Sequence, residues 1–189
     1  MTFRLLAVAI CIALVATLDA AKIKVETKYD KKYDFTGART YGWRPSAAGE
    51  VHLLQLSGDD AAALRERFEP VIVRAVDDAL GKRGLTRAAA SPDLEVWYYV
   101  LIGPGMTAQT MGQFLPAVTE WAVPPFAPAT QALEIYEQGT LILDMAGGDR
   151  VVWRGSARAE IDRQLSGATR DGRIQAAVRD MLKKFPPKK

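Results

Sequence analysis

Four acidic side chains in the C-terminal third are the first candidates for catalytic chemistry. Asp144 and Asp149 flank Gly147 and Gly148, a pair that predicts a tight turn, so the first two carboxylates could meet at a hairpin tip. Two carboxylates fall well short of the roughly six to eight oxygens that Ca²⁺ takes. Turn chemistry is the simpler interpretation, and we expect no metal ion at this tip.

A second acidic pair, Glu160 and Asp162, follows along the chain. Side chains two residues apart on a strand share a face, so these carboxylates could act as an acid and a base in hydrolysis. Arg158 and Arg163 lie close to them in the sequence, and surface ion pairs are the plainer interpretation. A hydrolase that uses these carboxylates stays the alternative.

Nucleophile, metal and nucleotide chemistry find little support elsewhere. The chain has one histidine, His52, and one cysteine, Cys11, whereas a zinc site needs about four nitrogen or sulfur ligands. His52 is interpreted as a surface residue. The glycines of Gly103–Gly105 lack the lysine and the helix start that a phosphate loop needs. The sequence therefore favours a protein that is not an enzyme and uses no cofactor.

Aromatic side chains supply the best candidates for a binding site. Trp97 and Tyr99 alternate with Tyr98 and so point to one face of a predicted strand, toward a Pro-rich segment that contains Trp121. Aromatic floors suit peptides, glycans and lipids, so Trp97, Tyr99 and Trp121 are predicted to line a ligand groove. Core packing is the plainer interpretation, because aromatic residues fill sheet faces readily.

Composition limits the choice of partner. The chain has 189 residues, 49% of them hydrophobic, and a net charge of +3, which is too small to indicate a nucleic-acid binder. Both ends are basic and the middle is acidic. If the ends meet, their lysines could contact an anionic polymer or a membrane surface; a solvated edge strand with a basic tail is the alternative. The lysines are Lys22, Lys24, Lys28, Lys31, Lys32, Lys183, Lys184, Lys188 and Lys189.

Residues 1–20 have the pattern of a cleaved secretory signal peptide. Arg4 precedes an apolar run over 5–18, and small residues follow. A helix of this run would extend about 21 Å, short of the roughly 30 Å hydrocarbon core of a bilayer. Cys11 lies inside the run, where lipidation would leave too short a signal. We expect a mature protein that starts near Lys22 and is free in the periplasm.

Hydrophobic patterning predicts one α+β domain over 22–189. Alternating or continuous apolar runs predict five strands, at 22–29, 39–43, 94–102, 139–146 and 150–161. The third strand is apolar on both faces and is predicted to be central. The short links between strands indicate two layers, a mainly antiparallel sheet with two helices packed on one face.

The two helices follow from apolar residues at helical spacing. The first has a capping-box pattern at Ser57 and Asp60 and extends to about 83, before Gly84. Pro70 inside it predicts a kink or two stacked pieces. The second helix ends before Pro186.

Two further expectations concern the sheet. The Pro- and Gly-rich excursion at 103–138 is predicted to be irregular and to cover the face that carries Trp97 and Tyr99. The last hairpin is predicted to have a three-residue loop, because that register places Leu143 opposite Trp153 and keeps the apolar face whole.

Six segments in order resemble a known family. They are Asp34–Pro45, Ala75–Gly84, Ser91–Leu94, Gly139–Asp144, Val152–Gly155 and Phe185–Pro187. Together they resemble the bacterial family called domain of unknown function 4136. The resemblance implies an exported envelope protein, often lipid-anchored, with an uncharacterised role and no established catalytic residues. This chain departs from it in lacking a polar, tyrosine-rich excursion and a lipid-attachment cysteine at the cleavage site.

These observations predict a non-enzymatic module, periplasmic or associated with the envelope and its outer membrane, that binds a protein or a cell-surface polymer. A periplasmic hydrolase using surface carboxylates is the alternative. Replacing all four carboxylates at once would separate the two classes. Lost function in a protein that still folds would favour the hydrolase.

Overall fold

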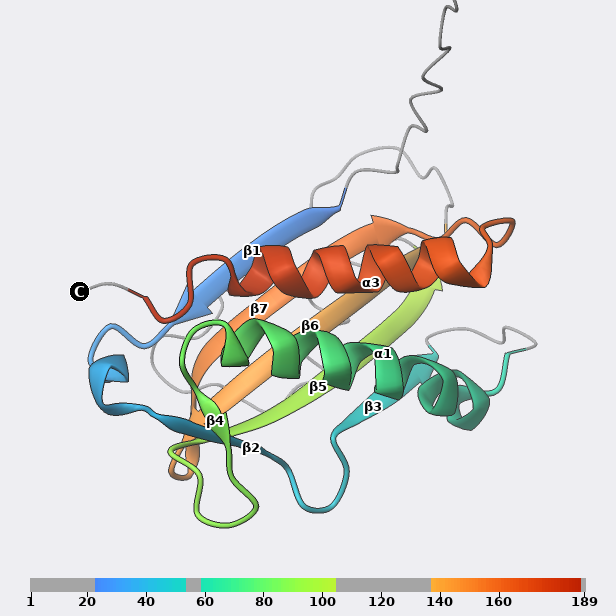
Figure 1. The fold of residues 1–189 in the computed structure, drawn as a ribbon. Helices are drawn as coiled ribbons and strands as arrows, with labels where there is room; N and C mark the ends of the chain where they lie inside the picture. Colours follow the sequence, from blue (N-terminus) through green and yellow to red (C-terminus); the bar gives the residue numbers. More distant parts are fainter. Residues whose placement is uncertain (1–22, 54–58, 105–136, 188–189) are drawn as a thin grey trace, which may run out of the picture.

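The computed structural model describes residues 23–53, 59–104 and 137–187. These residues form a seven-stranded sheet with two long helices packed together against one face (Figure 1). The predicted α+β class is confirmed. The elements are β1 (Lys24–Tyr29), the 3-10 turn η1 (Phe35–Gly37), β2 (Thr40–Trp43), β3 (Gly49–Leu53), α1 (Ala61–Gly81), β4 (Thr86–Arg87), β5 (Leu94–Pro104), β6 (Glu137–Gly147), β7 (Arg150–Glu160) and α3 (Gly167–Leu182).

The sheet is mixed but mostly antiparallel. Its order is β1-β7-β6-β5-β2-β4, and the contacts from β1 through β5 are antiparallel. The other edge of β5 is shared by two parallel strands: β2 pairs with its start and β3 with its later part. β5 is therefore paired on both edges, as expected of a central strand.

β5 also packs on both faces. Leu94, Val96 and Tyr98 belong to the large core between the sheet and the helices. Trp97 and Leu101 belong to a smaller buried cluster on the opposite face. Since neighbouring strand residues point to opposite faces, the continuous apolar run is what a strand with both faces covered requires.

Sequence patterns missed β3, which the structure places beside β5. The strand is short, and its first residue, Gly49, lies where a Cβ atom would collide with the Tyr98 ring. Glycine is what lets the two backbones approach there. Val51 and Leu53 then pack against the helix-side core. β4 was also missed, because two residues carry no periodicity.

The helix α1 is one continuous helix. It begins at Ala61, and Asp60 is its N-cap, whose carboxylate accepts the Ala62 N–H at 2.8 Å. The capping box with Ser57 as the cap is therefore wrong, and Ser57 itself lies outside the described residues. Pro70 stays inside the helix, on its exposed side, so two stacked pieces are also wrong. The packed apolar face holds the helix together despite the lost hydrogen bond.

The hairpin of β6 and β7 differs from the predicted register. Its loop has two residues, Gly148 with φ of +69° and Asp149, so the three-residue loop is wrong. The odd residue is instead a bulge in β7, because Met145 faces Trp153 while Ala146 faces Val151. The bulge lets the neighbours Val152 and Trp153 both enter the helix-side core, at 0% and 2% exposure. Turn geometry and core packing are thus satisfied together.

Two aspartates connect the segments that carry the family resemblance. Asp77 on α1 accepts hydrogen bonds from the Tyr41 hydroxyl (2.9 Å) and the Trp43 indole (3.0 Å). Asp93 accepts the backbone N–H groups of Arg39 and Thr40 and the Thr40 hydroxyl, at 2.8–2.9 Å. These bonds hold the pKa of Asp93 below its ordinary value. Both aspartates fix β2 in place.

Candidate functional site

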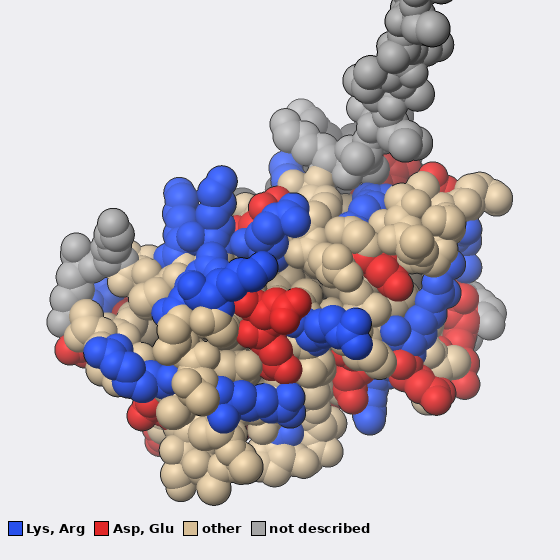
Figure 2. All heavy atoms as spheres, viewed as in Figure 1, with Lys and Arg blue, Asp and Glu red and all other residues tan. Residues whose placement is uncertain are grey.

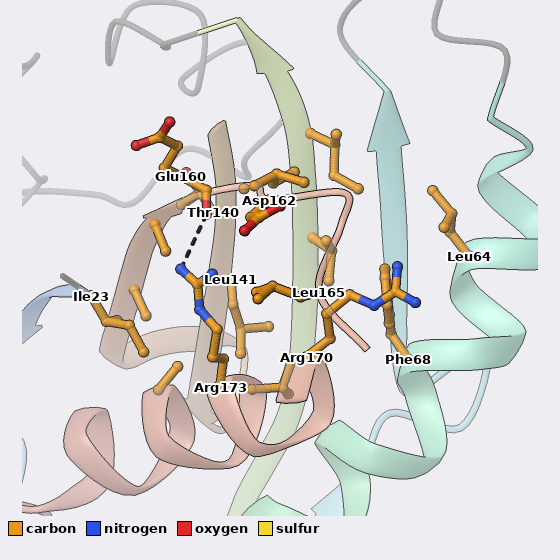
Figure 3. Close-up of a pocket in the computed structure, with 18 of the residues that line it drawn as sticks. Ile23, Leu64, Phe68, Thr140, Leu141, Glu160, Asp162, Leu165, Arg170 and Arg173 are labelled. Carbon is orange, nitrogen blue, oxygen red and sulfur yellow. Dashed lines mark hydrogen bonds between the residues drawn. The ribbon is translucent and has the colours of Figure 1, made fainter. Parts of the chain in front are cut away.

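A pocket of about 260 Å³ lies between the N-terminal halves of the two helices and one end of the sheet (Figure 3). Its walls come from α1, α3, β5, β6, β7 and the loop after β7. Apolar side chains make up most of the lining. They are Ile23, Leu64, Phe68, Ile72, Val100, Ile102, Leu141, Ala157, Ala159, Ile161, Leu165, Ile174 and Ala177.

The loop over 161–166 holds the open end of this pocket in shape. Asp162 accepts the Gln164 N–H at 2.8 Å and so forms a tight turn just past β7. Arg163 then makes an ion pair with Asp59 (2.8 Å), which ties the loop to the start of α1. Ser166 caps α3 by accepting the Thr169 N–H at 3.2 Å. Each of these contacts uses a polar residue suited to turns and caps.

The charged residues of the lining are four arginines and three acids. Arg163 is paired with Asp59, and Arg173 donates to the backbone oxygen of Glu160 at 3.1 Å. Figure 3 shows Arg173 directed toward Glu160, whereas Arg170 extends from α3 toward α1 and Phe68. The remaining charged residues are Arg67 and Asp162.

Arg170 and Arg67 differ from the other two arginines. The Arg170 Nε is buried and has no hydrogen-bond partner within the described part of the chain. Arg67 is exposed and its guanidinium lies 5.7 Å from the centre of the Phe68 ring. One of its terminal nitrogens is 3.8 Å from the place of a Cβ on Gly167, so Arg67 reaches α3 about one turn before Arg170. The two side chains approach from opposite helices.

The predicted aromatic groove falls on the other face of the sheet. Trp97 and Tyr99 are 3% and 4% exposed, and Trp121 lies outside the described residues. The guanidinium of Arg44 sits 3.6 Å from the centre of a Trp97 ring while it pairs with Glu95 at 3.0 Å. Tyr99 stacks on His52, with ring centres 6.1 Å apart. The groove therefore stays a prediction, with two of its three residues in a buried cluster.

Asp144 is a buried residue of β6 and not a hairpin-tip carboxylate, which corrects its interpretation as a turn residue. It is 0% exposed and forms a two-pronged ion pair with Arg154, at 2.6 and 2.7 Å. Burial raises the pKa of the Asp144 carboxyl, and the guanidinium opposes that rise. The register that places Asp144 opposite Arg154 makes this pair possible. Asp149 stays exposed in the turn.

The other predicted acids and His52 are dispersed. Glu160 ends β7, and Asp162 lies beyond that strand, although both line the pocket. The nearby arginines have other partners: Arg158 contacts Glu26 at 2.7 Å, and Arg163 contacts Asp59. His52 is half-buried on β3, 3.0 Å from Glu50. Over the described ranges, no cluster of three or more His, Cys, Asp or Glu side chains could hold a metal ion.

Aromatic packing joins two of the segments that carry the lysines of the predicted patch. The Phe35 and Phe185 rings lie 5.8 Å apart, and Arg83 donates to the Phe185 carbonyl at 2.9 Å. These contacts bring the segment after β1 close to the end of α3. Figure 2 shows basic side chains gathered on this side of the helix face. Lys22, Lys188 and Lys189 lie outside the described residues.

Comparison with known proteins identifies the family. The family model for Domain of unknown function (DUF4136) matches residues 25–187. The chain therefore belongs to this family, as the six segments predicted. No curated protein matches it. Within the described part of the chain, no helix is both long and apolar enough to cross a membrane.

Several solved structures are similar. A PDZ domain protein from Parabacteroides distasonis is 15% identical with a TM-score of 0.52, and the match covers 92% of this chain. This chain spans only 38% of that protein, and the likeness shows a shared fold. Two PelC dodecamer structures from Paraburkholderia phytofirmans are 8% and 7% identical, with TM-scores of 0.42 and 0.43. Each match covers 85% of this chain and 96% of PelC.

Sequence reasoning missed the pocket arginines. A signal was present, because Arg170 and Arg173 are three residues apart and so share one face of the predicted last helix. Arg67 likewise precedes Phe68, which belongs to the apolar stripe of the first helix. What the sequence did not show is that these two helix faces meet at the same end of the sheet.

Proposed function

We propose that this protein is a non-enzymatic module of the cell envelope that works by binding, and that the pocket between α1, α3 and the sheet is its binding site. The observation that carries the proposal is the pocket itself, about 260 Å³ with a mostly apolar lining. Small-molecule sites are typically concave, largely apolar and provided with a few polar groups. The pocket fits that description.

The arrangement of the carboxylates supports a binding role over hydrolysis. The buried Asp144 is paired with Arg154, which marks its position along β7. Glu160 lies on β7 six residues after Arg154. At roughly 3.3 Å per residue, these positions are about 20 Å apart, too far for one acid and base pair. Glu160 and Asp162 are the acids left for a hydrolase at the pocket, since the third acid of its lining, Asp59, is paired with Arg163. Such an enzyme would lose turnover but keep ligand binding in the double variant Glu160→Gln with Asp162→Asn.

A matched pair of substitutions tests the binding site. Ala159→Leu would fill part of the pocket, whereas Ala176→Leu adds the same atoms on α3 outside its lining. Calorimetric titration with 1-decanol, an uncharged ten-carbon chain, should show saturable binding to the wild type and to Ala176→Leu. Ala159→Leu should bind at least about tenfold more weakly while its thermal unfolding stays cooperative. Equal binding by both variants would remove the pocket from consideration.

The envelope location rests on residues 1–20, which have the composition of a secretory signal. The intact mass of the exported protein is expected to correspond to a chain that starts near Lys22, with no added acyl mass. A species starting at Cys11 with acyl mass would contradict a free periplasmic protein.

Contact with an envelope protein, an anionic polymer or the membrane surface is a second proposal, carried by the lysines. Phe35 packs on Phe185, so the segment that carries Lys31 and Lys32 meets the segment that carries Lys183 and Lys184, and all four lysines are exposed. Lys183→Glu with Lys184→Glu should abolish sedimentation with anionic vesicles in low salt and leave decanol binding unchanged. Sedimentation unchanged by both substitutions would exclude this patch.

A further inference from the structure

The pocket has a polar side as well as an apolar one. Its deep part is formed by core residues such as Ile72, Ile102 and Leu141, which are 1%, 8% and 9% exposed. Its charged residues come from α1, α3 and the ends of β7 and its following loop. A ligand that satisfies both sides has an apolar part and a polar end.

The charges at the rim favour an anionic end. Asp59 is already paired with Arg163, and Asp162 accepts a backbone N–H. Glu160 keeps an exposed carboxylate, but its backbone oxygen is what Arg173 contacts. Arg170 and Arg67 take part in no ion pair that the described residues supply. The first turn of α3 carries no acidic residue, and the nearest acid on that helix is Asp171.

Arg170 is the strongest indication. The buried Arg170 Nε has no acceptor, which is energetically costly, so turning this guanidinium toward a ligand carboxylate would gain an acceptor and break no hydrogen bond that the described residues make. Arginine presents its N–H groups in a planar fork that matches a carboxylate. Arg67, which reaches toward Gly167 from the other helix, is placed to contact the same anion from the opposite side.

The size of the pocket limits the apolar part to one chain. Its volume of about 260 Å³ is slightly below the range of typical ligand pockets, roughly 300–1,000 Å³. One acyl chain has no polar atoms to satisfy, so it suits a small cavity lined mostly by apolar side chains. The two chains of a phospholipid would need more space.

From these observations we infer that the pocket binds a single fatty acid, with its acyl chain between the helices and the sheet and its carboxylate held by Arg170 and Arg67. The inference rests on the proposed binding function and names the ligand class. Desolvated apolar surface would provide most of the affinity, and the two arginines would set the orientation and exclude uncharged or cationic ends.

Three probes separate the two parts of this ligand: decanoate, 1-decanol and acetate, titrated at neutral pH below micelle-forming concentrations. Decanoate should bind the wild type roughly tenfold or more tightly than decanol, and acetate should show no measurable binding. If decanol binds as tightly as decanoate, the fatty-acid inference fails and the binding function survives. If neither ten-carbon probe binds, both fail.

Arginine variants test the orientation. Arg170→Gln should weaken decanoate binding about tenfold and leave decanol binding unchanged, whereas Arg170→Lys should keep part of the preference. The control is Arg179→Gln, which removes an exposed arginine from the same helix outside the pocket. Equal decanoate affinity in Arg170→Gln and the control would overturn the assignment. If Arg170→Gln does not fold, Arg67→Gln, at an exposed position, takes its place with the same expected outcome.

Discussion

The two faces of the sheet bury different kinds of side chain. On the helix face, a large and almost entirely apolar core fills the space beneath α1 and α3 and ends in the open pocket. The opposite face has a small apolar cluster around Trp97 and Leu101, and beside it the buried Asp144–Arg154 pair and Arg44 over Trp97.

This difference separates two sources of order. Apolar packing is nondirectional and tolerates more than one arrangement, so the face covered by the helices can contribute stability and still contain a pocket. A two-pronged ion pair demands one geometry, so Asp144 and Arg154 favour the single register in which β6 and β7 meet. The same sheet therefore has one face that tolerates several packings and one that requires a single geometry.

Breaking the buried ion pair should have the largest effect. Arg154→Leu leaves the Asp144 carboxylate buried without a partner, and the free energy of unfolding should fall by about 3–5 kcal/mol in urea titrations. Adding Asp144→Leu to that variant should recover much of the loss, because no charge is then buried. The control Arg65→Leu breaks an exposed ion pair with Glu69 and should change stability by about 1 kcal/mol or less. A loss of similar size in the control would contradict this view.

Two neighbours on β6 compare the apolar parts of the faces directly. Leu143 and Ile142 are both 0% exposed, but Leu143 faces the large core and Ile142 the small cluster. Truncation to alanine should cost about 2–5 kcal/mol at either site, with the larger value at Leu143, where the surrounding packed core is more extensive. Chemical denaturation of the two variants measures both. A larger loss at Ile142 would show that the small cluster is the better packed.

The cation on the small cluster gives a milder test. Arg44→Ala removes the guanidinium above Trp97 and its pairing with Glu95, and should lower stability by about 0.5–2 kcal/mol. Arg44→Lys should recover only part of this, since lysine has no planar surface to stack. Identical stability in Arg44→Ala and the wild type would show that the contact does not stabilise the fold.

The smallest effect concerns pH and Asp93, one of the two aspartates that fix β2 in place. The pKa of Asp93 is lowered in the folded protein by the N–H groups of Arg39 and Thr40. Its contribution is therefore complete above its unfolded pKa of about 3.9 and is lost as the pH falls through the lower folded value. Below about pH 4 the wild type should lose stability more steeply than Asp93→Asn. Parallel pH profiles of unfolding for the two proteins would refute the role of this carboxylate.

Most elements that pack on the helix-covered face of the sheet could be predicted from the sequence, because their signals are local. Apolar residues at helical spacing in α1 and α3, and the run from Leu94 to Ile102, each carry a period that burial requires. The family assignment followed from six segments, two of which contain Asp77 and Asp93, whose carboxylates accept hydrogen bonds from a third segment, Asp34–Pro45. Those residues were recognisable as a pattern before their contacts were known.

The remaining features depend on register and on the meeting of distant segments. Asp144 was predicted to be a turn residue. Only the bulge at Val152 places it opposite Arg154, and the sequence pattern does not show that bulge. The pocket is lined by Arg67 and Arg170, which lie on helices about a hundred residues apart along the chain. β3 was missed because Gly49 reads as a break, whereas in the sheet it makes room for the Tyr98 ring.

The pairing of β1 with β7 sets the order in which the chain can fold. Glu26 contacts Arg158 across 132 residues of sequence, so the first strand of the sheet has no neighbour until nearly the whole chain has been made. Loops that long close slowly compared with local helices and hairpins. The β6–β7 hairpin and the helices can form before β1 adds to the edge of β7. β1, the first strand of the sheet along the chain, is thus among the last strands to pair.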